Sequence, residues 1–112
     1  MRLALVLHAL ALLAASARAG DLNDYPTVAR ADYVLACMKA NGDTRTSLER
    51  CSCSIDVIAS LVPYDAYVAA ETVASIEQQA GQVGSLMRNT ALARDALNDL
   101  RRAQAEAQVR CF

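Results

Sequence analysis

The stretch RCSCSID, residues 50–56, holds two of the four cysteines of this 112-residue chain, Cys51 and Cys53, with one residue between them. On an α-helix, positions i and i+2 lie about 200° apart around the axis. If the stretch is helical, the two sulfur atoms face different neighbours and cannot readily bond to each other. We therefore expect disulfide bonds that tie this segment to two other parts of the chain, at Cys37 and Cys111.

Two pairings of the four cysteines remain once Cys51–Cys53 is set aside. An antiparallel hairpin centred near Thr44 would bring Cys37 level with Cys51, which favours Cys37–Cys51 together with Cys53–Cys111. Matching of apolar stripes instead favours Cys51–Cys111, because both residues lie within apolar helical faces. We prefer the pairing that the hairpin predicts, and the other stays open.

The first nineteen residues have the pattern of a secretory signal peptide. A basic Arg2 precedes an apolar run over residues 3–15, and Ala17-Arg18-Ala19 is an Ala-x-Ala cleavage site before Gly20. The run is too short to span a bilayer comfortably. Cleavage would leave 93 residues with nine basic and twelve acidic side chains, a net charge of −3. We expect an exported protein, periplasmic or secreted.

Helical patterns fill most of the remaining sequence, and no segment has the pattern of a strand. We expect a flexible N-terminal arm over residues 20–26 and a single helical domain over 27–112. The predicted fold is all-α, a small disulfide-stapled bundle of three to four helices. In so small a core, disulfide bonds would add needed stability.

The expected helix boundaries follow from capping residues. The first helix runs from Pro26-Thr27 to Ala40 and stops at Asn41-Gly42. The second runs over 47–61, with Thr46 as N-cap and Glu49 completing a capping box. A third begins near Pro63, and a last, long helix follows Asn89-Thr90.

Periodicity predicts which faces are buried. In the first helix, five apolar residues share one face: Val28, Ala31, Val34, Leu35 and Met38. In the second, Cys51 lies in a stripe with Ile55, Ile58 and Val62. In the last, the apolar face consists of Leu92, Ala93, Ala96, Leu97, Leu100, Ala103, Ala107 and Cys111. The alanines of this face predict a close approach of the last helix to its neighbours.

Composition excludes several kinds of chemistry. The only histidine, His8, lies in the predicted signal peptide, and the chain has no tryptophan. The exported protein would therefore have no histidine for general base catalysis, for a nucleophile–histidine pair or for zinc. A net negative charge argues against nucleic acid as a partner, because proteins that bind the phosphate backbone present a basic surface to it. We expect no enzymatic activity, no cofactor and no stable membrane insertion.

A sulfur-based function is the alternative. Arg50 beside Cys51 would lower a thiol pKa, but a Cys-x-x-Cys redox motif is absent. Copper(I) prefers soft sulfur ligands, which Cys51, Cys53, Cys37 and Met38, with Met87, would supply. Structural disulfides and methionine as core filler are the commoner uses of these residues.

Other candidate positions have ordinary structural explanations. Asp95 and Asp99 are four residues apart on the last helix, and Arg102 and Glu106 are expected to form an i,i+4 ion pair on a solvated face. Three tyrosines, Tyr33, Tyr64 and Tyr67, would line a ligand groove or lie half-buried in the core.

We predict an exported accessory or protein-interaction protein that binds another exported protein. Its size and disulfide use are similar to those of small helical chaperones of the bacterial periplasm, without a shared motif, so this is an analogy of class. The sequence leaves the partner, the pathway and the oligomeric state open.

Overall fold

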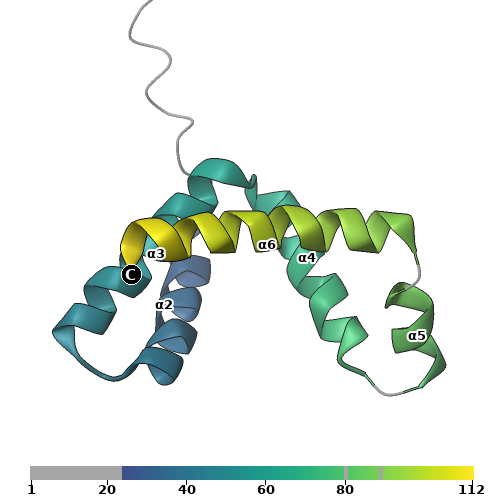
Figure 1. Ribbon diagram of the computed structural model, residues 1–112, viewed down its shortest axis with the longest axis horizontal. Helices are drawn as coiled ribbons and strands as arrows, with labels where there is room; N and C mark the ends of the chain where they lie inside the picture. Colours follow the sequence, from purple (N-terminus) through teal and green to yellow (C-terminus); the bar gives the residue numbers. More distant parts are fainter. Residues whose placement is uncertain (1–23, 80, 89) are drawn as a thin grey trace, which may run out of the picture.

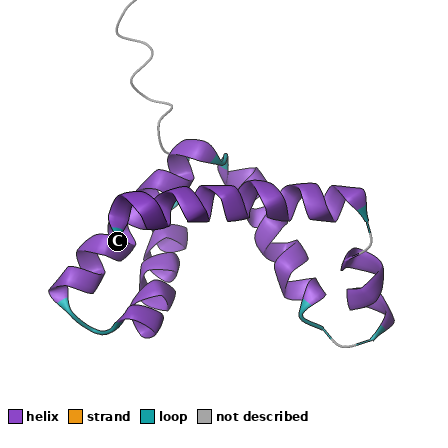
Figure 2. Cartoon of the chain, viewed as in Figure 1, coloured by secondary structure: helices purple, strands orange, loops and turns teal. Residues whose placement is uncertain are grey.

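The computed structural model describes residues 24–79, 81–88 and 90–112, with the side chains of Val83, Met87 and Arg88 left out, and all its regular elements are helices (Figure 2). The predicted signal peptide lies outside these ranges. The described helices are α2 (Thr27–Asn41), α3 (Arg45–Leu61), α4 (Tyr64–Glu77), α5 (Gln82–Arg88) and α6 (Ala91–Cys111). The predicted all-α, disulfide-stapled fold is confirmed. The described ranges hold five helices rather than three or four, because residues 82–88 form a short helix of their own.

The helices form two hairpins crossed by one long helix (Figure 1). α2 packs on α3, α4 packs on α5, and α6 packs on both α3 and α4. The two hairpins diverge because α3 and α4 meet at an angle of 110°. Pro63 at φ −58° lacks an N–H and holds Val62 in an extended conformation, so α3 cannot continue through this point.

This layout explains how Cys111 reaches Cys53. In a plain up-down bundle, the last helix would run past the level of Cys53 before Cys111 arrives. Instead, α4 ends at Glu77, and Gly81 takes a φ of +106°, a conformation that favours glycine. After α5 (Gln82–Arg88), α6 runs back across both hairpins (Figure 1).

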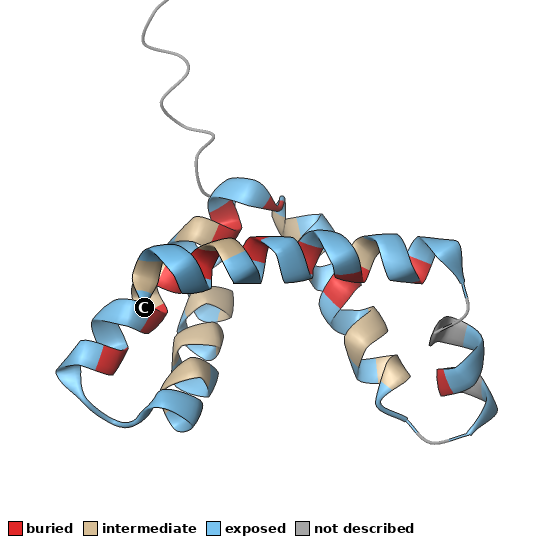
Figure 3. Cartoon of the chain, in the orientation of Figure 1, coloured by how far each residue is buried: buried red, intermediate tan, exposed pale blue. Residues whose placement is uncertain are grey.

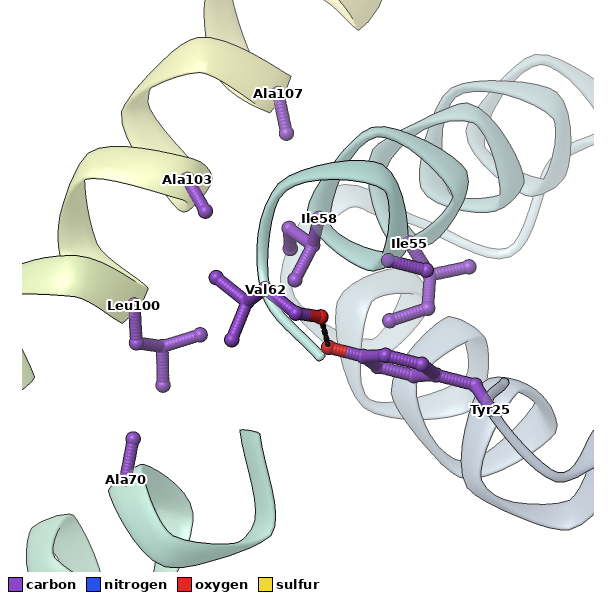
Figure 4. Close-up of a cluster of buried hydrophobic side chains, with 9 residues drawn as sticks. Tyr25, Ile55, Ile58, Val62, Ala70, Leu100, Ala103 and Ala107 are labelled. Atoms are coloured by element: carbon purple, nitrogen blue, oxygen red, sulfur yellow. Dashed lines mark hydrogen bonds between the residues drawn. The ribbon is translucent and has the colours of Figure 1, made fainter. Parts of the chain in front are cut away.

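The core lies where α6 crosses α3 and α4 (Figures 3 and 4). α6 contributes Leu100, Ala103 and Ala107, and α4 contributes Ala70. The predicted stripe of α3 is confirmed, because its four members are all buried: Cys51, Ile55, Ile58 and Val62. The small side chains of Ala103 and Ala107 let α6 approach α3 closely, as the sequence predicts.

Two predicted apolar faces are wrong in part. No residue of α2 is buried, and Val28 and Leu35 are 68% and 61% exposed. The physical reason is that α3 is the main packing partner of α2, so the opposite side of α2 faces solvent. Leu92 is 83% exposed although Ala93 and Leu97 of the same helix are buried, because Leu92 lies at the edge of the apolar face of α6.

The N-terminus of α3 is capped two residues earlier than predicted. Thr44, not Thr46, is the N-cap, and its Oγ1 accepts a hydrogen bond of 3.1 Å from the Ser47 amide. Glu49 does not reach back to the cap, because it pairs with Arg45 at 2.9 Å. The Ser47 hydroxyl also donates to the Asn41 carbonyl at 3.0 Å, which closes the turn between α2 and α3.

The variant Thr44→Ala should therefore lower the free energy of unfolding by about 1 kcal/mol, because an amide at the start of α3 loses its acceptor. The matched variant Thr46→Ala should change it by less than about 0.5 kcal/mol, since Thr46 is exposed. Urea denaturation followed by circular dichroism measures both. Equal losses, or a larger loss for Thr46→Ala, would contradict the cap assignment.

The described part of the predicted flexible arm, residues 24–26, is docked rather than loose. Tyr25 is 5% exposed, and its hydroxyl donates to the Val62 carbonyl at 2.8 Å (Figure 4). Asp24 accepts a hydrogen bond of 3.0 Å from the Tyr64 amide at the start of α4. The sequence pattern predicted a flexible arm here. It did not show that the Val62 carbonyl and the Tyr64 amide, at the corner between α3 and α4, need hydrogen-bond partners that this segment supplies.

The variant Tyr25→Phe should cost about 1–2 kcal/mol, because it leaves the buried Val62 carbonyl without this donor while keeping the ring. Tyr64→Phe is the control, since the Tyr64 hydroxyl has no hydrogen bond within the described part of the chain. Chemical denaturation of both variants gives the comparison. A stability of Tyr25→Phe equal to that of the native protein would show that the arm contributes nothing through this bond.

Candidate functional site

The cysteines form the two disulfides that the hairpin argument favours. Cys37 is bonded to Cys51 with Cα atoms 5.8 Å apart, and Cys53 is bonded to Cys111 with Cα atoms 5.7 Å apart. The Cys-Ser-Cys stretch of α3 is thus clamped to α2 on one side and to the end of α6 on the other. The pairing expected from stripe matching, Cys51–Cys111, does not form.

The cysteine sulfur atoms expected for a copper site are not brought together as free ligands, and the Met87 side chain lies outside the described part of the chain. Cys51 and Cys53 bond to partners on different helices, and no free cysteine occurs within residues 24–112. The described residues also contain no group of three or more histidine, cysteine or carboxylate side chains that could hold a metal ion. Met38 is half-buried beside Cys37. Arg50 was expected to lower the pKa of a thiol. Its Cζ atom instead lies over the Phe112 ring, 5.8 Å from the ring centroid.

An open cleft of about 980 Å³ lies between the two hairpins, beneath α6. One wall is the face of α2 formed by residues 29, 32, 33, 36 and 37, a spacing that places them on one side of a helix. The opposite wall is α4, and α6 contributes the roof. The residues of α4, of α6 and of the C-terminus that border the cleft are Tyr67, Val68, Glu71, Thr72, Ser75, Ile76, Gln104, Gln108 and Phe112.

The charged side chains of the cleft are all negative. Asp32 stands on α2 and Glu71 on α4, and among the described side chains no lysine, arginine or histidine borders the cleft. Neither carboxylate forms a salt bridge with any residue in the described ranges. The nearest basic residue along α2, Arg30, is engaged with Asp56 of α3. The cleft therefore carries a carboxylate on each of two walls, and no described cation neutralises either one.

Two tyrosines connect the cleft to the core. Burial raises the pKa of Tyr67 to about 12, with further contributions from Glu71, Tyr33 and Asp32. Burial also raises the pKa of Tyr33, a hydrogen bond with Ser54 opposes this, and Glu71 adds to it. Both tyrosines remain neutral hydroxyl donors at physiological pH, and both pack against the core cluster. The two interpretations offered by the sequence, groove lining and half-buried core, thus apply together.

Tyr64 has a different position from the other two. Its ring lies 5.1 Å from that of Tyr25 and does not border the cleft. Tyr25, which the sequence did not single out, also packs 5.1 Å from Tyr67. Burial raises the pKa of Tyr25 as well, so its hydroxyl stays a donor to Val62. This cluster holds Tyr67 in place at the inner end of the cleft.

The remaining candidates are on solvated faces. Asp95 and Asp99 are both exposed on α6, away from the cleft. The predicted Arg102–Glu106 pair is wrong: Arg102 pairs with Asp99, and Glu106 pairs with Arg110 at 2.7 Å. Both are i,i+3 or i,i+4 pairs of exposed side chains, and such pairs contribute little to stability.

The fold and the disulfide bonds define the class of this protein. It is a small all-α protein with two disulfide bonds and a cleft between two helical hairpins, lined by acidic and aromatic side chains. Disulfide-bonded cysteines are compatible with an oxidising compartment. No protein-family model, no curated protein and no solved structure matches this chain. Within the described residues, no single helix is long and apolar enough to cross a membrane, and only the bent pair α3–α4 passes that test of length and composition jointly.

Proposed function

We propose that this chain is an exported accessory protein, periplasmic or secreted, that binds a segment of another exported protein without catalysing a reaction. The observation that carries the proposal is the open cleft between α2 and α4. The side chains of the described residues leave it unfilled, and it combines apolar, aromatic and hydrogen-bonding groups, as binding sites do.

The disulfides support this function by fixing the walls of the cleft. Cys37 itself borders the cleft, and its bond to Cys51 holds α2 against α3. The bond between Cys53 and Cys111 anchors the end of α6, next to Phe112, which also borders the cleft. A binding surface held by covalent links loses less conformational entropy on association than a flexible one.

Site-specific photo-crosslinking in cells that export the protein tests this proposal. Val68 is 42% exposed on the α4 wall of the cleft, whereas Leu92 is 83% exposed on the far end of α6. A photoreactive amino acid at position 68 should give a discrete adduct with one exported protein, and the same label at position 92 should not. Labelling of neither position, or equal labelling of both, would contradict binding in the cleft.

Two measurements on the purified protein test the other parts of the proposal. Mass spectrometry should show Gly20 as the first residue, and a retained Met1 would contradict export through signal cleavage. A free-thiol count should give none under denaturing conditions. Free Cys51 and Cys53 would instead favour the sulfur-based alternative, thiol redox or copper(I) handling.

A further inference from the structure

We propose that the cleft binds a segment of its partner that carries lysine or arginine side chains beside aliphatic ones. This inference rests on the proposed function, a binding site for another protein between α2 and α4. It adds the chemistry of the occupant, which follows from the charge, the size and the side chains of the cleft.

Charge complementarity is the first argument. Asp32 and Glu71 border opposite walls, without a salt bridge to any residue in the described ranges, and no basic side chain within those ranges borders the cleft. Both carboxylates lie near enough to Tyr67 to raise its pKa, so their fields overlap at the inner end of the cleft. A cationic side chain in the cleft would be attracted by both carboxylates, whereas a phosphate or carboxylate ligand would be repelled.

The neutral lining is the second argument. Tyrosine rings attract ammonium and guanidinium groups, and Tyr33 and Tyr67 border the cleft beside the two carboxylates. Aliphatic contacts are available on both walls, from Ala29 and Ala36 of α2 and from Val68 of α4. Lysine and arginine suit this mixture, because their aliphatic stems pack on apolar surface while their charged ends reach polar groups.

The dimensions of the cleft fit a segment of polypeptide. Its volume of about 980 Å³ is at the upper limit of small-molecule sites, which hold roughly 300–1,000 Å³. A helix about 10 Å across with a pitch of 5.4 Å fills about 420 Å³ per turn, so the cleft has room for about two turns. Two turns present one face with a cation and one or two aliphatic residues, which matches the lining.

Fluorescence anisotropy with three labelled synthetic peptides of twelve residues tests the inference. All three are alanine–leucine helices that carry, at every fourth position, lysine, glutamate or glutamine. The lysine peptide should bind the native protein at least about tenfold more tightly than either of the others, and raising the salt concentration should weaken it. The protein variant Asp32→Asn/Glu71→Gln should lose about tenfold in affinity for the lysine peptide.

The matched control is Asp43→Asn/Asp95→Asn, which makes the same change in net charge at two exposed positions outside the cleft. It should bind the lysine peptide like the native protein. Equal losses in both variants would overturn the inference, because the attraction would then come from net charge and not from the cleft. Preference for the glutamate or glutamine peptide, or no binding of the lysine peptide, would overturn it as well.

Two further outcomes separate this inference from the function on which it rests. If spermine displaces the lysine peptide and binds as tightly, with the same sensitivity to Asp32→Asn/Glu71→Gln, the ligand is a free amine and the inference of a protein segment is wrong. If photo-crosslinking from position 68 gives its adduct undiminished in this variant, a partner occupies the cleft but its cationic character is disproved. Loss of the adduct in the variant and its retention in the control would support the inference.

Discussion

Replacing the disulfide between Cys53 and Cys111 with two alanines should lower the melting temperature by roughly 15–30 °C. This bond closes a loop over a sequence separation of 58, against 14 for the bond between Cys37 and Cys51. Chain-entropy estimates give about 4 kcal/mol for the longer loop and about 3 kcal/mol for the shorter. For a domain of this size, 1 kcal/mol corresponds to about 4–8 °C.

Position in the fold adds to the effect of the longer bond. The bond between Cys53 and Cys111 fixes the C-terminal end of α6. Among the described helices, α6 is the only one that packs on both α3 and α4. Its loss lets the end of α6 fray from the α3 stripe, whereas loss of Cys37–Cys51 frees only α2, from which no residue is buried. The predicted order of stability is native protein, then the Cys37→Ala/Cys51→Ala variant, then the Cys53→Ala/Cys111→Ala variant.

Differential scanning calorimetry of the native protein and both double variants measures this order. Alanine is the appropriate replacement, because Cys51 is fully buried. A serine hydroxyl at that position would lower the stability further through the cost of burying a polar group. Peptide mapping without reductant should confirm the two bonds in the native protein. A melting curve of the native protein that reductant leaves unchanged would show that the disulfides do not stabilise the fold.

The second large effect is expected at Leu100. Leu100 is 3% exposed between α3 and α4, and Leu100→Ala should lower the free energy of unfolding by about 2–5 kcal/mol. The alanines beside it, Ala103 and Ala107, cannot rearrange to fill the resulting cavity. The variant Leu92→Ala, on the same helix and with the same change in side chain, should cost less than about 0.5 kcal/mol.

Urea denaturation of both leucine variants decides between two descriptions of α6. Sequence periodicity places Leu92 and Leu100 on one continuous apolar face, while the structure buries only the second. A large loss of stability in Leu92→Ala would show that Leu92 itself is packed in solution, so that the whole predicted apolar face of α6 is buried. Equal losses at both positions would favour a compact bundle.

Several features of the fold could be predicted from the sequence because they depend on neighbouring residues. Helix boundaries at Pro63, Thr90 and Asn41-Gly42 follow from local backbone restrictions and capping, and the structure confirms them. The buried stripe of α3 follows from helical periodicity. The separation of Cys51 and Cys53 onto different partners follows from the 200° angle between positions i and i+2.

The N-cap of α3 shows the limit of such local reasoning. Both Thr44 and Thr46 have a side chain suited to capping, and a glutamate three residues after Thr46 favoured the second. The turn from α2 decided for Thr44, because Ser47 is held by the Asn41 carbonyl and Thr44 alone is placed to accept from its amide.

Only the tertiary structure decided how the helices cross and what lies between them. Periodicity gives each helix an apolar face, but it does not state which faces find a partner, so Val28, Leu35 and Leu92 were wrongly expected in the core. The docking of Tyr25 also depends on a carbonyl 37 residues away, which no local pattern reports. The cleft arises from the 110° angle between α3 and α4, which brings Asp32 and Glu71 to facing walls although their sequence separation is 39. Residue type and spacing thus determined the helices and their staples, whereas the site is a product of long-range packing.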